Sequence, residues 1–230
     1  MPNILSTTTV LLATACITLL SACSTSGGGE PSVTHDGLTL VPKSRFQDVY
    51  MKPGADLSVY SELGMEPCKV SFKANWMRDQ NTSRRSPSNR VREEDVDKIK
   101  DALGEACSEQ FREALLDEPA YNLVDEFDNG ENVLVLRPAI IDLDINAPDL
   151  NSPGRANSYT TSAGEMTLYL ELADATTNET LARIVDKRRG MDTQRLQWTN
   201  SVSNKAEMER ILRRWAKLLR EGLDEVRSQP

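Results

Sequence analysis

The stretch EEDVDKIKDALGEACSEQFREALL, residues 93–116, predicts a long amphipathic helix around which the other elements are arranged. Its apolar residues recur at steps of three and four, which places them on one face of a helix with about 3.6 residues per turn. They are Val96, Ile99, Leu103, Cys107, Phe111 and Ala114. Acidic residues begin the stretch, where the helix dipole favours negative charge. Pro119 ends the pattern, because proline interrupts helical hydrogen bonding.

Five strands are predicted around this helix, one before it and two hairpins after it. They cover residues 69–76, 121–127, 132–145, 166–172 and 180–188. The first alternates apolar and polar residues, the period of two that is typical of a half-buried strand. The first hairpin turns at residues 128–131, and its second strand is expected to pass Pro138 at a bulge or an edge. The second hairpin ends in the basic run 187–189, which suits a charged edge strand or, alternatively, an anionic partner.

A second amphipathic helix is predicted at the end of the chain. Asn204 is its expected N-cap, and Glu207 completes a capping-box pattern. Its buried stripe consists of Met208, Ile211, Leu212, Trp215, Leu218, Leu219, Leu223 and Val226. Basic residues cover its other faces, and a basic amphipathic helix can lie on a membrane. We expect packing on the sheet instead, because the strands need a cover.

These elements predict an α+β fold, a two-layer sandwich in which two helices cover a mainly antiparallel sheet of about five strands. The strand–helix–strand opening allows one parallel pairing through a right-handed crossover. Residues 38–66 contain several prolines and glycines, so an irregular surface segment is expected there. A single domain is expected over residues 41–230, after a flexible tether at residues 23–40 that begins rich in Gly and Ser.

The N-terminal segment resembles the leader of a bacterial lipoprotein. Residues 4–20 are mostly apolar or small and carry no ionisable side chain, but they are too few to span a membrane. Residues 20–23, LSAC, resemble the lipobox, the signal that directs acylation of its cysteine and cleavage before it. Residues 1–22 are therefore predicted to be a signal peptide, and Cys23 the lipidated residue. Cys16 is a rival acceptor that lacks a large apolar residue three positions earlier, and no Lys or Arg precedes the apolar run.

The lipobox also predicts where the domain is held. Ser24 follows the acceptor where Asp would signal retention, which fits release to the outer membrane of a diderm cell. We expect a palmitate-bearing lipid anchor in that membrane and a domain facing the periplasm. Contact with the membrane is expected through the acyl chains on Cys23, because an acidic domain gains no electrostatic adhesion to anionic lipid.

The cysteines that remain after processing predict a disulfide. Cleavage removes Cys16 and acylation occupies Cys23, which leaves Cys68 and Cys107. Thiols tend to pair in an oxidising compartment. Cys107 lies on the apolar face of the first helix, where it can meet Cys68 at the start of the first strand. Two separate buried thiols are the alternative.

Composition excludes several classes of function. The formal net charge of −8 argues against nucleic-acid binding, which needs a basic footprint. The one histidine, His35, lies in the predicted tether, which excludes Ser-His-Asp and Cys-His nucleophiles and histidine-based metal sites. Asp142 and Asp144 share one face of a predicted strand, where they could bind a cation or act as acid and base. A solvated strand face is the favoured interpretation, so no metal, cofactor or enzymatic activity is expected.

Two motifs carry a family resemblance. They are YMKPGADLSVY at residues 50–60 and LADATTNETLA at residues 172–182. Both resemble motifs of a bacterial lipoprotein family catalogued as domain of unknown function 3313, in which Gly often stands at the position of Asn178. The resemblance covers roughly residues 40–227. It implies an envelope lipoprotein with one α+β domain, and it implies no activity or catalytic residues, since the family has none assigned.

The expected function is therefore a non-enzymatic one. We expect a membrane-anchored lipoprotein that binds or scaffolds another component of the cell envelope, an unidentified protein or glycan. One alternative is a carrier or sensor of a small apolar or anionic ligand, which an apolar cavity would favour. The other is a hydrolase of cell-wall glycan, which a deep pocket converging on perturbed carboxylates would favour.

Overall fold

The computed structural model describes residues 32–82, 84, 86–127, 130–145, 159–160, 164–189, 197–198 and 201–228. Residues 31–230 form one compact unit. Within the described ranges, no helix has the length and apolar character needed to cross a membrane.

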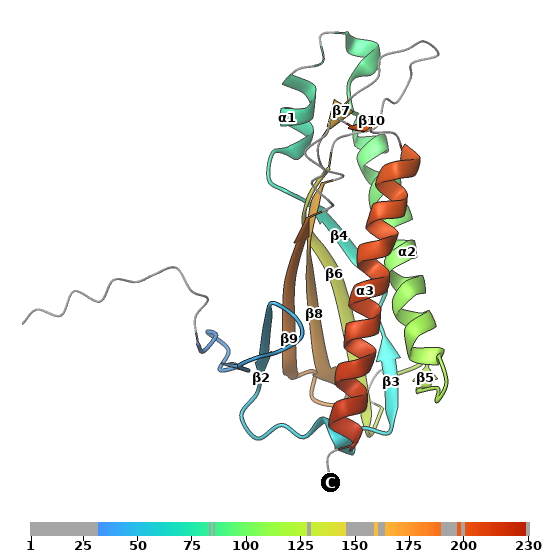
Figure 1. Cartoon of the computed structure of the whole chain (residues 1–230). Helices are drawn as coiled ribbons and strands as arrows, with labels where there is room; N and C mark the ends of the chain where they lie inside the picture. Colours follow the sequence, from blue (N-terminus) through green and yellow to red (C-terminus); the bar gives the residue numbers. More distant parts are fainter. Residues whose placement is uncertain are drawn as a thin grey trace, which may run out of the picture. The chain divides into compact units, whose positions relative to one another are not determined.

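The main sheet has eight strands, and two short strands pair separately as a ribbon (Figure 1). The main strands are β1 (Thr39–Leu40), β2 (Asp48–Met51), β3 (Glu62–Met65), β4 (Lys69–Phe72), β5 (Asn122–Val124), β6 (Val133–Asp144), β8 (Glu165–Asp174) and β9 (Thr180–Arg189). The ribbon pairs β7 (Tyr159–Thr160) with β10 (Gln197–Trp198). The order across the main sheet is β1-β2-β9-β8-β6-β3-β5, and β4 also pairs with β6.

Three α-helices accompany the sheet. They are α1 (Trp76–Thr82), α2 (Glu93–Leu116) and α3 (Ser201–Ser228), with short 3-10 helices η1 (Leu57–Val59) and η2 (Pro87–Asn89). The long helices α2 and α3 pack side by side against one face of the sheet (Figure 1). The predicted α+β class and the two-helix cover are confirmed. The predicted sheet was wrong in detail, because the described part contains eight main strands in a mixed arrangement and a third helix.

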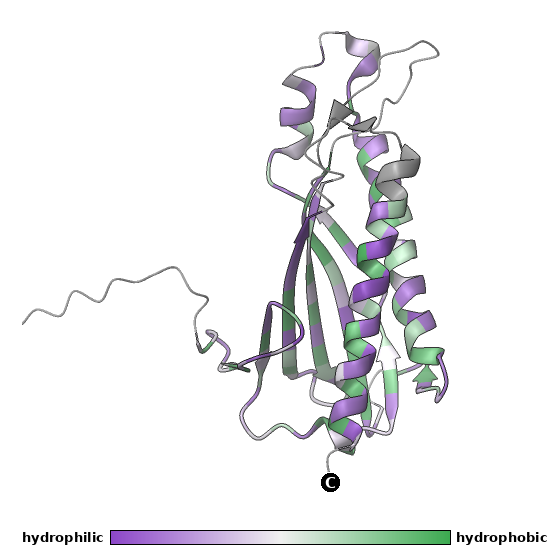
Figure 2. Ribbon diagram, viewed as in Figure 1, coloured by the Kyte–Doolittle hydropathy of each residue, from purple (hydrophilic) through white to green (hydrophobic). Residues whose placement is uncertain are grey.

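Apolar side chains on the helix-facing sides of β6 and β8 form the centre of the core. Along β8, apolar residues alternate with more polar ones (Figure 2). Leu136, Ile140, Leu168 and Leu170 are fully buried there. The matching faces of α2 and α3 contribute the residues that the two periodic stripes predicted, among them Cys107, Phe111, Leu212 and Trp215.

The first predicted hairpin does not form. β5 and β6 both pair in parallel with β3, which lies between them: Glu62 is opposite Asn122 on one side and Val133 on the other. β3 lies within residues 38–66, the segment that was expected to be irregular. Gly64 is required there, because a Cβ atom on it would lie 2.5 Å from Cγ of Phe127, which packs over β3.

β6 continues past Pro138, as predicted. The Leu136 carbonyl accepts a hydrogen bond from the Glu66 N–H, so by strand alternation the Pro138 nitrogen points to the same side. On that side β3 has ended at Met65 and β4 begins its pairing with Lys69 opposite Ala139. Proline therefore occupies the gap between two partner strands, where its missing N–H removes no ladder hydrogen bond.

The first predicted strand ends earlier than its alternating pattern indicated. β4 stops at Phe72, and Asn75 adopts a left-handed φ of 63° that turns the chain. Trp76 then begins α1 and stacks on Phe72 with ring centroids 4.1 Å apart. Its indole N–H donates to the carbonyl of Ile145 at 2.7 Å. The aromatic residue is thus buried as the pattern required, but on a helix.

α3 begins at Ser201, so Asn204 lies inside the helix and the predicted N-cap was wrong. The apolar stripe was assigned correctly: Trp215 is fully buried, and its indole N–H donates to the buried carboxylate of Asp186 on β9 at 3.0 Å. Packing on the sheet, rather than on a membrane, occupies this face of the helix.

The second predicted hairpin is confirmed as β8 and β9. Its basic end is paired within the chain: Lys187 and Arg189 contact Glu165, and Arg188 contacts Asp186. The predicted edge strand was wrong for most of β9, which lies between β2 and β8. Its pairing with β2 ends at Val185, so only the basic end extends past that neighbour.

Candidate functional site

The two predicted disulfide residues are joined. The Cys68–Cys107 bond links the residue just before β4 to the centre of α2. Close approach of the two elements depends on Gly104, since a Cβ atom there would lie 2.8 Å from the Cys68 carbonyl oxygen. The Cys68 N–H also donates to the Ser108 hydroxyl at 3.0 Å. The bond therefore fixes the helix layer to one side of the sheet.

The predicted lipidation site lies outside the described residues. This holds for Cys23, for its rival Cys16 and for the signal peptide at residues 1–22. Residues 32–40 were assigned to a flexible tether, but the structure holds them against the sheet: Val33 forms a bridge with Thr39, and Leu38 is buried. The ordered fold thus begins at least eight residues earlier than the domain boundary predicted at 41.

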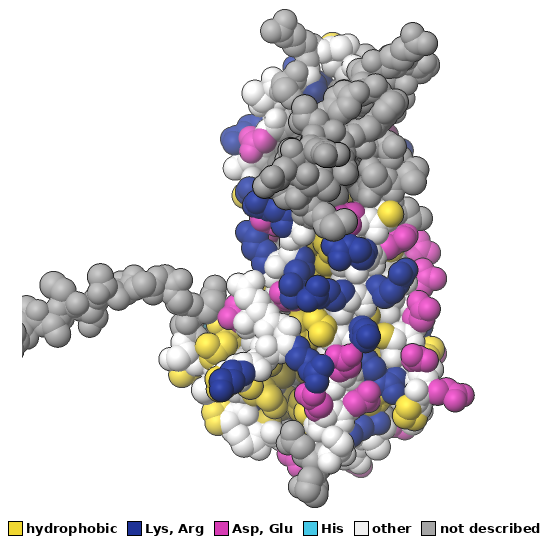
Figure 3. Space-filling model, in the orientation of Figure 1, with side chains coloured by type: hydrophobic (Ala, Val, Ile, Leu, Met, Phe, Trp, Pro, Cys, Tyr) yellow, Lys and Arg dark blue, Asp and Glu magenta, His cyan; other side chains and the backbone are white. Residues whose placement is uncertain are grey.

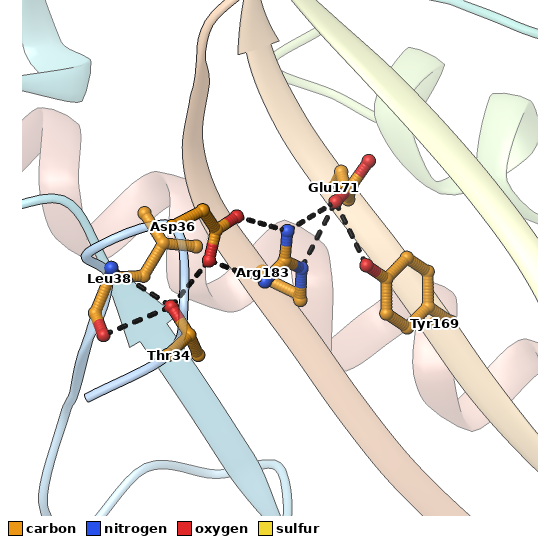
Figure 4. Close-up of polar contacts among 6 residues, drawn as sticks. All are labelled: Thr34, Asp36, Leu38, Tyr169, Glu171 and Arg183. Atoms are coloured by element: carbon orange, nitrogen blue, oxygen red, sulfur yellow. Dashed lines mark hydrogen bonds and ion pairs between the residues drawn. The ribbon is translucent and has the colours of Figure 1, made fainter. Parts of the chain in front are cut away.

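A polar cluster holds this segment on the face of the sheet opposite the helices (Figure 4). Arg183 on β9 lies between Asp36 and Glu171, with Nη2 at 2.6 Å from Asp36 Oδ2 and 2.8 Å from Glu171 Oε1. The hydroxyl of Tyr169 donates to the same Glu171 oxygen at 3.0 Å. Thr34 donates to Asp36 and so orders the turn. We call these residues the Arg183 clasp.

The clasp is electrostatically fixed near neutral pH. Hydrogen bonds from Arg183 hold the pKa of the Asp36 carboxyl well below its usual range, and Asp36 in turn raises the pKa of Arg183. Burial and the neighbouring Glu171 raise the pKa of Tyr169 to about 12. These three groups keep their usual charge states at neutral pH, and their contacts position residues 34–38 on the sheet.

Contrary to the prediction from the sequence, Asp142 and Asp144 do not lie on one face of a regular strand. A register shift between Ile141 and Asp144 and a left-handed φ of 52° at Asp142 break the strand alternation that placed both on one face. Asp144 forms an ion pair with Lys73 at 2.9 Å, and Asp142 is exposed. Within the described ranges, no three His, Cys, Asp or Glu residues are grouped as metal ligands.

An apolar groove lies beside the C-terminal half of α3, with a cavity volume of about 480 Å³. α3 forms one wall, β2 and the segment at residues 41–46 form the other, and side chains of β8 and β9 form the floor. Its apolar lining includes Val41, Phe46, Val49, Met51, Leu57, Leu172, Ala182, Ile184, Leu218, Leu219, Leu223 and Val226. Apolar side chains reach the surface beside the lower half of α3, and Lys and Arg side chains lie above them along the helix (Figure 3). We call this the α3 groove.

Charged residues form the rim of the α3 groove. Arg45 reaches from the 41–46 segment to α3, where it pairs with Glu221 at 2.7 Å and with Glu225. Lys43 lines the groove with its backbone in the left-handed region at φ 61°, and among the described residues it has no ion-pair partner. The rim therefore ties the two walls together and leaves one cation available.

Gly222 leaves the groove open. It is the one glycine of α3, and glycine inside a helix destabilises it by roughly 0.5–1 kcal/mol relative to alanine. A Cβ atom on Gly222 would meet nothing within 4 Å, so no close approach within the fold requires glycine here. Gly222 lines the groove, so the absence of a side chain there leaves space in the groove.

The two sequence motifs meet at one end of the groove. The Tyr60 hydroxyl of the first donates to Asp174 of the second at 2.8 Å, and Lys52 pairs with Glu179 at 2.5 Å. Each motif contributes groove-lining residues, among them Leu57 and Leu172. Asn178 adopts φ 59°, the left-handed region that glycine enters most easily. Glycine, the residue that the family resemblance leads us to expect there, fits the same conformation.

Sequence reasoning missed the groove because separate segments build it. The apolar residues of the 41–57 region were noticed, but without the position of β2 they had no assigned neighbour. The available signal was Gly222 within a strong apolar stripe, which indicates a gap in the helix surface.

Fold and site define a class: an α+β domain with a solvent-open apolar groove. The chain belongs to the family described as Protein of unknown function (DUF3313), whose model matches residues 34–219. The family resemblance of the two motifs is thereby confirmed. No curated protein matches the sequence.

Solved structures show only distant likeness. The PelC dodecamer from Paraburkholderia phytofirmans has 9% identity and a TM-score of 0.35, covering 74% of this chain and 96% of that one. A minor lipoprotein from Acinetobacter baumannii has 10% identity and a TM-score of 0.32, with coverages of 74% and 96%. A putative neuraminyllactose-binding hemagglutinin homolog from Helicobacter pylori has 8% identity and a TM-score of 0.34, with coverages of 74% and 87%. Likeness at these scores carries no argument about function.

Proposed function

We propose that this protein is a lipid-anchored, non-enzymatic binding component of the cell envelope, which holds an apolar part of its partner in the α3 groove. The observation that carries the proposal is the groove itself, apolar along its lining and charged at its rim. Pockets of about 300–1,000 Å³ with this composition commonly bind ligands. Among binding proteins, such a groove favours a carrier or sensor of an apolar ligand.

The anchor in this proposal is an acylated Cys23, exposed by removal of residues 1–22. The lipobox at residues 20–23 supports it, and Ser24 supports release to the outer membrane with the domain in the periplasm. Residues 24–31 separate Cys23 from the described fold, and a chain of that length spans at most about 30 Å. The domain therefore stays close to the membrane that holds it.

The pKa shifts of seven side chains support binding rather than hydrolysis. A carboxylic acid that donates a proton at neutral pH needs a raised pKa. Hydrogen bonds to the ionised carboxylates instead lower the pKa of Asp36, Asp56, Glu165 and Asp174. Burial raises the pKa of Tyr60, Tyr121 and Tyr169 to about 12. All seven groups are thus held in the charge state that they normally have at pH 7.

Cys23→Ser is expected to leave an uncleaved precursor that incorporates no labelled palmitate, because serine has no thiol to receive the diacylglyceryl group. Palmitate labelling and fractionation in the native host measure this. The matched control is Cys16→Ser, which should be processed and labelled like the wild type and should reach the outer membrane. Normal labelling of Cys23→Ser would move the acceptor to Cys16 or end the lipoprotein proposal.

A further inference from the structure

Two cations lie beside the α3 groove. Arg214 lies one helical turn before the groove residue Leu218, on the same side of α3, and Lys217 is adjacent. Among the described residues Arg214 has no ion-pair partner, and neither does Lys43 on the opposite wall. The two carboxylates of the rim are already engaged by Arg45. Two cations without an ion-pair partner among the described residues therefore lie at the groove, Lys43 in its lining and Arg214 one turn before its α3 wall.

The apolar part of the groove is elongated along the helix. Its α3 wall runs from Leu218 to Val226, which is about 12 Å of helix. Gly222 lies midway along this wall and presents no side chain. The space therefore extends along α3 and is mostly apolar, with Lys43 in its lining and Arg214 beyond the start of its α3 wall.

This combination matches a lipid molecule. We propose that the α3 groove binds one acyl chain of an anionic phospholipid from the anchoring membrane, with the chain over Gly222 and the phosphate toward Lys43 and Arg214. The inference rests on the proposed function, since the anchor keeps the domain beside that membrane. Burial of methylene groups drives binding of the chain, and the cations favour an anionic headgroup. The apolar face of α3 is packed on the sheet, so the lipid enters the groove while the helix stays in the fold.

A photo-cross-linking experiment in the native host tests this with the full chain. p-Benzoylphenylalanine replaces Leu218 in cells grown with ³²P-phosphate, which labels phospholipid headgroups and leaves the acyl chains of a lipoprotein anchor unlabelled. After irradiation, the purified protein is expected to carry ³²P. The matched control places the same photoreactive residue at Ala102, an exposed position on α2. That protein should carry none.

Two variants test the groove and its charge. Gly222→Phe fills the groove and should reduce the ³²P adduct roughly tenfold or more. Its melting temperature should be no lower than that of the wild type, because Cβ has open space and phenylalanine is a better helix former than glycine. Lys43→Glu combined with Arg214→Glu should reduce the adduct roughly fivefold, as expected for exposed charge pairs.

The outcomes separate this inference from the proposed function. Absence of ³²P on a protein that still fractionates with the membrane and carries palmitate overturns the phospholipid inference alone. A protein that lacks palmitate and fractionates as soluble overturns the proposed function. An adduct that is equally strong at Ala102, that persists in folded Gly222→Phe, or that maps to the chain's own acylated N-terminus also overturns the inference.

Discussion

Trp215→Ala is expected to lower the free energy of unfolding by about 3–5 kcal/mol, as large-to-small changes in a packed core do. Trp215 is fully buried between α3 and the sheet. Its loss also leaves the Asp186 carboxylate, which is 1% exposed, without its indole donor. Because typical domains are stable by only about 5–15 kcal/mol, residues 31–230 made as a soluble protein should melt far below the wild type or fail to fold. Thermal melting of that compact unit measures the change.

Trp215→Phe is the matched control. It keeps an aromatic ring in the core but has no N–H for Asp186, so it should lose part of the stability that Trp215→Ala loses. An unchanged melting temperature for Trp215→Ala, together with weaker binding to liposomes, would contradict the packing of α3 on the sheet.

Loss of the Cys68–Cys107 bond is expected to lower the free energy of unfolding by about 4 kcal/mol in the chain-entropy account. The bond closes a loop between residues separated by 39 positions, which restricts the unfolded chain. Denaturant unfolding of the wild type with and without reductant should show this difference. Cys107→Ser should match the reduced wild type and should not respond to reductant.

Alkylation with a heavy maleimide provides the direct check of the bond. The unfolded wild-type domain should gain two labels only after reduction. Equal labelling with and without reductant would show that the two thiols are separate.

The long helices were predictable because their signals are local. α2 has an apolar residue every three or four positions, acidic residues at its start and Pro119 beyond its end, and both of its bounds were predicted correctly. The stripe of α3 was equally clear, but the start of the helix was placed at Asn204 because that residue begins a capping-box pattern. The helix instead begins three residues earlier, at Ser201. The β8–β9 hairpin was found for the same reason, since its alternation and turn are contiguous in the sequence.

The sheet order was not predictable because it depends on a distant partner. The turn-like residues before β6 favoured a hairpin with β5, but β3 inserts between the two strands from almost 60 residues away. β2 and β3 are only four residues long, which is too short for a periodic signal. The groove could not be predicted for the same reason, because its wall at residues 41–46 is positioned by distant pairing. β1 and β2 place this wall, and Arg45 holds it to α3.

We propose that the α3 groove of the anchored protein holds an apolar molecule. The most direct measurement is mass spectrometry of the lipids extracted from wild-type protein and from Gly222→Phe, both purified from membranes of the native host in the same mild detergent. We predict a phospholipid retained in stoichiometric amount by the wild type and lost from Gly222→Phe. Equal lipid content in the two proteins, whether present in both or absent from both, would contradict the claim.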